Sequence, residues 1–113
     1  MSIRREYLST AHDGERVYRY HLQNQDGTGI VLMNLGANIT GISVPDRHGK
    51  IDDVALGFDD WTRYLQPHGC MGDTIGRFAN RIGSGRFAID GVPYQLPRNA
   101  AGKHHIHGGA TGF

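Results

Sequence analysis

The chain has 113 residues, of which 38% are hydrophobic and 17 are glycine. This length allows one domain at most, and the composition predicts a turn-rich protein with a thin apolar core. The 12 basic and 11 acidic residues give a net charge of +1 with histidine neutral, and no basic run occurs, which argues against nucleic-acid binding.

Strand signals dominate the first half of the chain. Residues 17–23 alternate between an apolar side, which contains two tyrosines and Leu22, and a mostly polar side. The turn signal at residues 24–27 (NQDG) connects this segment to a short apolar run at residues 29–34. The two segments therefore predict a β-hairpin.

Two further strands are expected at residues 39–44 and 51–57, on either side of the polar turn at residues 45–50. Turns recur about every ten residues, and this spacing is typical of an all-β sandwich or barrel. One short helix is expected at residues 59–66, where an aspartate could cap the start and Pro67 would end it.

A second hairpin is expected after a glycine-containing, loop-rich segment that reaches residue 84. Its strands are predicted at residues 86–90 and 92–96, around the turn Asp90-Gly91. Pro93 lies inside the second strand, which places that strand at an edge or a bulge. Residues 97–103 are interpreted as a polar linker.

The single cysteine and the N-terminus bear on the cellular compartment. Cys70 has no cysteine partner, so an internal disulfide is impossible. The N-terminus has no apolar stretch after its basic pair, and no apolar run approaches the length of a membrane span. We therefore expect a cytoplasmic protein. Cys70 is interpreted as a structural thiol, because His68 is the sole candidate to activate it.

The first candidate binding segment is residues 76–82 (GRFANRI). Its glycine lets the backbone turn sharply and approach a ligand closely. Arg77 and Arg81 each offer a planar fork of donors, and Asn80 supplies donors and an acceptor, which are the groups that sugar hydroxyls need. The same residues would also suit a solvated loop with surface arginines, and residue types alone leave both readings open.

The second candidate segment contains His104, His105 and His107, the last of which precedes two glycines. Three roles are open for these histidines: a metal site, a structural or exposed position, and contact with a ligand or catalysis. A metal site would need further ligands, and no cysteine pair lies nearby. Signals for nucleotide binding and for a serine nucleophile are absent from the sequence, so no cofactor is expected.

Short motifs in the order and spacing of one known family run through nearly the whole chain. They are Asp13-Gly14, Leu22 and Asn24, residues 34–37 (NLGA), 44–50 (VPDRHGK), 53–58 (DVALGF), 74–83 (TIGRFANRIG), 85–87 (GRF), Asp90-Gly91, 94–96 (YQL), Asn99, His107-Gly108-Gly109 and Gly112-Phe113. With these motifs the chain resembles the N-terminal portion of aldose 1-epimerase, also called galactose mutarotase.

The resemblance implies a fold, an activity and a site. The fold would be all-β, the N-terminal part of a large antiparallel β-sandwich (the galactose mutarotase supersandwich), which binds a hexose in an open cleft. The activity would be interconversion of the α and β anomers of hexoses such as galactose and glucose. Asn80 and Arg81 would hydrogen-bond sugar hydroxyls, and His107 would contact the sugar near its ring oxygen and anomeric end, as a substrate-binding and catalytic residue.

The resemblance also implies that the chain is incomplete. In the family, a second histidine gives a proton to the ring oxygen, a glutamate takes the anomeric proton, and an aspartate binds the sugar, all downstream of the last motif. The chain, residues 1–113, is therefore expected to be a single-domain portion truncated after His107-Gly108-Gly109 and inactive by itself. Its partner would be a small-molecule hexose, with no metal, nucleic acid or membrane, and exposed apolar surface could drive self-association.

Two alternatives stay open at the level of sequence. A non-catalytic carbohydrate-binding β-domain would share the sandwich and lack the acid–base pair. A hexose-6-phosphate mutarotase relative would need extra cationic groups for its phosphate, and the sequence supplies arginines without placing them.

Overall fold

Strands dominate the structure, which is a computed structural model that describes residues 1–67 and 69–110. The helices among these residues are two short 3-10 turns, so the expectation of an all-β fold is confirmed. The chain divides into two units, Met1–Thr74 (unit 1) and Ile75–Phe113 (unit 2). His68 and the motif Gly112-Phe113 lie outside the described residues.

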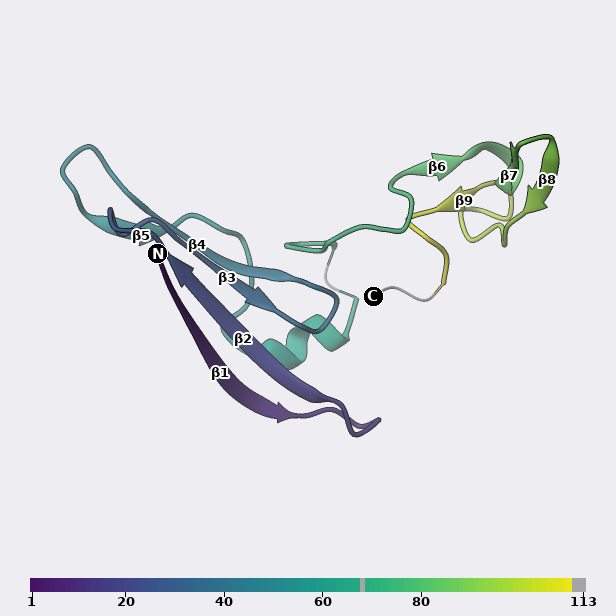
Figure 1. Cartoon of the computed structure of the whole chain (residues 1–113). Coiled ribbons are helices and arrows are strands. Elements are labelled where there is room, and N and C mark those ends of the chain that lie inside the picture. Colours follow the sequence, from purple (N-terminus) through teal and green to yellow (C-terminus); the bar gives the residue numbers. More distant parts are fainter. Residues whose placement is uncertain (68, 111–113) are drawn as a thin grey trace. The chain divides into compact units, whose positions relative to one another are not determined.

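Unit 1 is built on a five-stranded antiparallel sheet whose strands lie side by side in chain order (Figure 1). The strands are β1 (Ser2–Thr10), β2 (Arg16–Gln23), β3 (Gly29–Met33), β4 (Ile39–Pro45) and β5 (Ile51–Asp53). The predicted hairpin at residues 17–34 is confirmed as β2 and β3, whose connecting loop has Gly27 at a φ of 85°. Glycine suits this left-handed conformation because it has no Cβ.

Two strand predictions in unit 1 need correction. The strand expected at residues 51–57 ends at Asp53, because the Asp53 carboxylate accepts hydrogen bonds from the N–H groups of Ile42 and Ala55, both at 2.9 Å. These bonds turn the chain away from the ladder. Strand β1 was not predicted, since its charged residues hide its alternation; pairing with β2 creates it.

The buried core of unit 1 lies on one face of this sheet. Val17 and Met33 are 2% and 1% exposed, and Tyr64 packs against them at 6%. From the alternation in the sequence, the opposite side of β2, which carries Leu22, is expected to be the apolar side that faces the core. The core forms on the Val17 side because Phe58 and the helical turn after it cover that face.

The opposite face of the sheet carries a row of aliphatic side chains. Ile3 pairs with Leu22, Leu22 with Ile30, and Ile30 with Ile42, so the row crosses four strands. Ile3 is 62% exposed at its end. This face, which we call the aliphatic face, is therefore the less covered side of unit 1.

The expected helix is present as the 3-10 turn η1 (Trp61–Leu65). Asp60 caps it, as predicted, by accepting hydrogen bonds from the backbone N–H and the hydroxyl of Thr62 at 2.9 and 2.7 Å. These bonds lower the pKa of Asp60. The turn ends at Leu65, and Gln66 is extended before Pro67, as the restriction on residues preceding proline requires.

Unit 2 contains two small antiparallel ladders. Its elements are β6 (Arg81–Ile82), η2 (Gly83–Gly85), β7 (Arg86–Ile89), β8 (Val92–Gln95) and β9 (His105–Ile106). The pair β7–β8 confirms the predicted hairpin, and within the described residues β8 has β7 as its only strand partner, as Pro93 indicates. The two-residue strands β6 and β9 were not predicted, because two residues show no period.

Cys70 is exposed, so the interpretation of a structural thiol is not supported, because an exposed thiol fills no core. The described residues form no helix with the length and apolar character needed to cross a bilayer.

We predict that Asp53 makes the stability of unit 1 depend on pH. Backbone donors from Ala55 and Ile42 lower its pKa, so the stabilisation is complete above the unfolded-state pKa of ~3.9 and is lost as pH falls through the lower folded-state pKa. Asp53→Ala should lower the free energy of unfolding by about 1 kcal/mol. Asp53→Asn keeps the acceptor oxygen, so thermal melts between pH 6 and pH 3 should show a smaller acid loss than wild type. Identical acid profiles for wild type and Asp53→Asn would contradict the assignment.

Candidate functional site

The pairing of β6 with β9 brings together the two segments that the sequence analysis singles out. Arg81 pairs with Ile106, and Ile82 pairs with His105. Just beyond the ladder, the His107 N–H donates to the carbonyl oxygen of Asn80 at 3.2 Å. Asn80, Arg81 and His107, which are 27 residues apart at most in the sequence, therefore lie beside one another in unit 2.

The ring of His107 is oriented by the backbone. The Asn80 N–H donates to Nδ1 of His107 at 3.2 Å. Because Nδ1 acts as the acceptor, the proton of the neutral imidazole sits on Nε2. The side chain is exposed, so Nε2–H is a donor that faces away from its backbone support and can reach a ligand.

Asn80 and Arg81 support one another. The Arg81 guanidinium donates from Nη1 to Oδ1 of Asn80 at 3.2 Å, and both residues are exposed. Asn80 has a φ of 60° and His107 a φ of 51°, in the left-handed region where asparagine and histidine occur more often than most residues. The site thus offers hydrogen-bond donors from a guanidinium and an imidazole, and an amide that can both donate and accept. These groups suit ligands with several hydroxyl groups.

Gly108 allows the two segments to approach closely. A Cβ at this position would overlap the carbonyl oxygen of Gly76 and the backbone nitrogen of Arg77. These atoms belong to the main chain and cannot rotate away. The glycine after His107 is therefore required for packing of the two motifs, in addition to its φ of 82°.

Asn99 holds β9 from its other side. Its Nδ2 donates to the carbonyl oxygen of Ile106 at 2.9 Å, and its Oδ1 accepts from the Ile106 N–H at 2.8 Å. The side-chain amide thus acts as an extra strand partner for the residue before His107. The sequence places Asn99 within a family motif but does not predict its contact with Ile106, because no regular local structure brings residues seven apart together in this way.

The other two histidines have structural contacts. His105 is 4% exposed, and its Nδ1 bonds to the carbonyl oxygen of Pro97 at 2.9 Å. Nδ1 of His104 accepts from the Ser84 N–H at 3.1 Å. Of the roles left open by the sequence, both therefore take the structural one. Within residues 1–67 and 69–110, no three histidine, cysteine or acidic side chains are placed to hold a metal ion.

An apolar pocket of about 270 Å³ borders Arg81. Its other walls are Phe78, Ile82 and Phe87. Phe78 is 56% exposed although it lies two residues before Asn80. The candidate site therefore combines hydrogen-bonding groups with an adjacent apolar wall, as small-molecule sites commonly do.

Comparison with known sequences gives one consistent family. The sequence model of the family described as "Aldose 1-epimerase" matches residues 18–113. The galactose mutarotase of Mus musculus is 42% identical over 100 residues, and that of Homo sapiens is 40% identical over 100 residues. Each match covers 88% of this chain and 29% of the relative. The chain thus spans less than a third of the length of these relatives.

Comparison with solved structures agrees with the sequence result. The galactose 1-epimerase from Lactobacillus acidophilus matches with a TM-score of 0.72 at 26% identity, over 96% of this chain and 31% of the other. An aldose epimerase homologue from C. elegans matches with a TM-score of 0.70 at 34% identity, over 81% of this chain and 28% of the other. The strands described above therefore follow the fold of these proteins.

We predict that Asn99 keeps His107 in a single tautomer. In the wild-type chain, ¹⁵N NMR of the imidazole above the usual titration range of histidine should show the proton on Nε2 of His107. Asn99→Ala removes both bonds to Ile106, so β9 should loosen and the His107 signals should move toward a mixture of tautomers.

Asn24→Ala is the matched control, because Asn24 also bonds backbone N–H groups through its side chain, in a loop of unit 1. It should leave the His107 signals unchanged. A pure Nδ1–H tautomer in the wild-type chain would show that the assigned bond from Asn80 is wrong.

Proposed function

This chain belongs to the aldose 1-epimerase family, and we propose that it supplies the sugar-holding part of an enzyme that interconverts the α and β anomers of hexoses such as galactose and glucose. The family membership follows from the sequence model and the relatives. The substrates and the reaction are the proposal. Acid–base ring opening takes the proton of the anomeric hydroxyl, breaks the bond between the anomeric carbon and the ring oxygen, and delivers a proton to that oxygen without net oxidation or reduction. The proposal therefore includes no metal or nucleotide cofactor. It also includes a cytoplasmic location, because a chain with a single cysteine has no internal disulfide and fits a reducing compartment.

The observation that supports the proposal is the meeting of Asn80, Arg81 and His107 at the end of the β6–β9 ladder. The three side chains are exposed on two paired backbone segments and are held by hydrogen bonds to the main chain or to each other. A sugar hydroxyl both donates and accepts, and this group of side chains provides both functions.

In the proposed reaction, His107 is the residue nearest the chemistry. Its Nε2–H would donate to an oxygen at the ring-oxygen and anomeric end of the sugar, while Asn80 and Arg81 fix neighbouring hydroxyls. Such a donor stabilises negative charge that develops on oxygen as the ring opens. Positioning by the two other side chains keeps the sugar in one orientation during proton transfer.

The acid and the base of the reaction are proposed to lie outside this chain. The chain covers 29% of the mouse relative, and the family resemblance assigns proton transfer to a histidine and a glutamate further along. Each positioned acid or base contributes ~10²–10⁴ in rate. The 113-residue chain is therefore proposed to bind sugar weakly and not to catalyse.

We predict that polarimetry on freshly dissolved α-D-galactose will distinguish the 113-residue chain from a full-length protein that contains it. The purified 113-residue chain should leave the rate of mutarotation at the buffer value. A chimera in which this chain replaces the matching N-terminal part of the mouse galactose mutarotase should accelerate it. In the chimera, His107→Ala should lower kcat/KM by about 10² or more, because a donor to the reacting end of the sugar is lost.

His12→Ala is the control, because His12 is an exposed histidine of unit 1 outside the candidate site. It should not change the rate of the chimera. Rapid equilibration by the 113-residue chain, unchanged by His107→Ala, would refute the assignment of the catalytic groups. A folded chimera that binds galactose without accelerating mutarotation would favour a non-catalytic carbohydrate-binding domain.

We also propose that a second copy of the chain covers the aliphatic face when the chain is alone. Ile3 is 62% exposed there, and the nine residues of β1 form an edge that bonds only to β2 among the described residues. Long exposed edges and apolar faces favour pairing between copies. The matched relatives are more than three times as long, so their folds hold further chain that can cover this face.

Sedimentation velocity over a range of concentrations tests this proposal. The wild-type chain should show mass increasing with concentration, and Ile3→Lys should reduce it by placing a charge on the aliphatic face. Leu56→Lys is the matched control, since Leu56 is 80% exposed and lies outside that face. A monomer at every concentration would reject self-association.

A further inference from the structure

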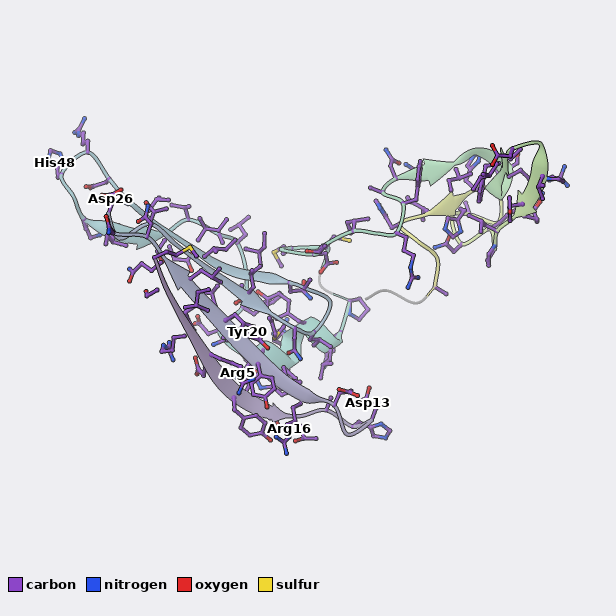
Figure 2. The ribbon with its side chains drawn as sticks, in the orientation of Figure 1. Arg5, Asp13, Arg16, Tyr20, Asp26 and His48 are labelled. Atoms are coloured by element: carbon purple, nitrogen blue, oxygen red, sulfur yellow. The ribbon has the colours of Figure 1, made fainter. Side chains whose placement is uncertain are left out.

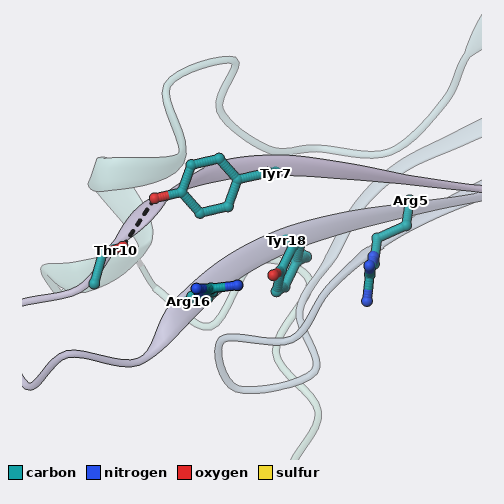
Figure 3. A pocket seen from close by; sticks show the side chains of 5 residues that line it. All are labelled: Arg5, Tyr7, Thr10, Arg16 and Tyr18. Atoms are coloured by element: carbon teal, nitrogen blue, oxygen red, sulfur yellow. Dashed lines mark hydrogen bonds between the residues drawn. The ribbon is translucent and has the colours of Figure 1, made fainter.

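One pocket of unit 1 lies at the hairpin end of β1 and β2. It has a volume of about 540 Å³ and is lined by Arg5, Tyr7, Thr10, Arg16 and Tyr18 (Figure 3). Arg5 and Tyr20 come from paired positions, so they share a side of the sheet, and Arg16 lies further along the same strand as Tyr20 (Figure 2). No residue of this pocket belongs to the candidate sugar site, which lies in unit 2.

A β-bulge in β1 builds the polar end of this pocket. The register passes from Tyr7 opposite Tyr18 to Ser9 opposite Val17, so Leu8 is the extra residue. The shift places Thr10, instead of Ser9, opposite Arg16. The Thr10 hydroxyl then bonds to the Tyr7 hydroxyl at 2.8 Å (Figure 3). Bulges commonly re-aim side chains near functional sites.

The two arginines of the pocket flank one aromatic ring. The guanidinium carbon of Arg5 lies 4.7 Å from the centroid of the Tyr18 ring, a cation–π contact. Arg16 lies across the Tyr18 side chain from Arg5 (Figure 3), and hydrogen bonding to the Tyr18 phenol raises the pKa of Arg16. Tyr18 therefore orients both guanidinium groups, one over its ring and one at its hydroxyl.

The positive charge in the pocket is not neutralised by the lining. Its five residues include no carboxylate, and neither Arg5 nor Arg16 takes part in an ion pair among the described residues. The nearby Asp13 accepts the Glu15 N–H through Oδ1 at 3.0 Å and forms no ion pair with Arg5 or Arg16 among the described residues. Two guanidinium groups line this pocket together with the hydroxyl groups of Tyr7, Thr10 and Tyr18, which leaves donors available for an anion.

We propose that this pocket binds a phosphate monoester of a small organic molecule. Guanidinium donors match the oxygens of a phosphate group, and arginine suits this role better than lysine because its fork is planar. The hydrogen bond between Tyr7 and Thr10 uses one of their two hydroxyl protons and leaves the other free for a further phosphate oxygen. The pocket volume is in the range of small-molecule sites, and the tyrosine rings offer apolar contact for the carbon skeleton.

Equilibrium dialysis with glucose 6-phosphate, glucose and inorganic phosphate tests the proposal, on the 113-residue chain at a concentration where sedimentation velocity shows a monomer. Glucose 6-phosphate should bind saturably, inorganic phosphate more weakly, and glucose should not compete. Arg5→Gln and Arg16→Gln should each weaken the binding of glucose 6-phosphate about tenfold. Higher salt should weaken it further, because both arginines are exposed.

Arg47→Gln is the matched control, since Arg47 is an exposed arginine in the turn between β4 and β5. It removes the same charge from the same unit and should leave binding unchanged. Equal weakening by Arg47→Gln and Arg16→Gln, or no saturable binding of glucose 6-phosphate, would overturn the proposal. His107→Ala should not affect this binding, so its outcome is independent of the proposed mutarotase activity.

Discussion

Hydrogen bonds from short polar side chains to the main chain hold the strands in place, because the apolar core is very small. Val17, Met33 and Tyr64 are the buried hydrophobic residues of the described chain. Asn34 extends the β2–β3 pairing by accepting from the Tyr18 N–H and donating to a carbonyl of β2, both at 2.8 Å. Asp53 and Asn99 do the same for β4 and β9. A satisfied polar group fixes geometry where packing cannot.

The same dependence explains how unit 2 can present a site. No apolar side chain of unit 2 is buried among its described residues, yet Asn80 and His107 meet through two hydrogen bonds that involve the main chain. The backbone donor selects the His107 tautomer, and Gly108 permits the approach that makes this bond possible. The orientation of the His107 ring therefore comes from the main chain of Asn80.

The two faces of the sheet in unit 1 differ in what they can do. One face is covered by Phe58 and η1 and supplies the core. The other combines an aliphatic row that begins at Ile3 with the arginine–tyrosine pocket at the hairpin end. The proposed association between copies would depend on burial of apolar area, which salt weakens little. The proposed anion binding would depend on attraction between exposed charges, which salt screens strongly.

The sequence alone determined the all-β class, the two hairpins with their glycine turns, the capped turn before Pro67 and the family motifs, because these features depend on local conformational preference. The order of the motifs in the sequence also identified Asn80, Arg81 and His107 as candidate site residues. Only the tertiary structure decided that residues 27 apart in the chain lie together, which face of β2 is buried, and where β1, β6 and β9 pair. These outcomes depend on contacts between distant segments, and a strand of two residues carries no periodic signal of its own.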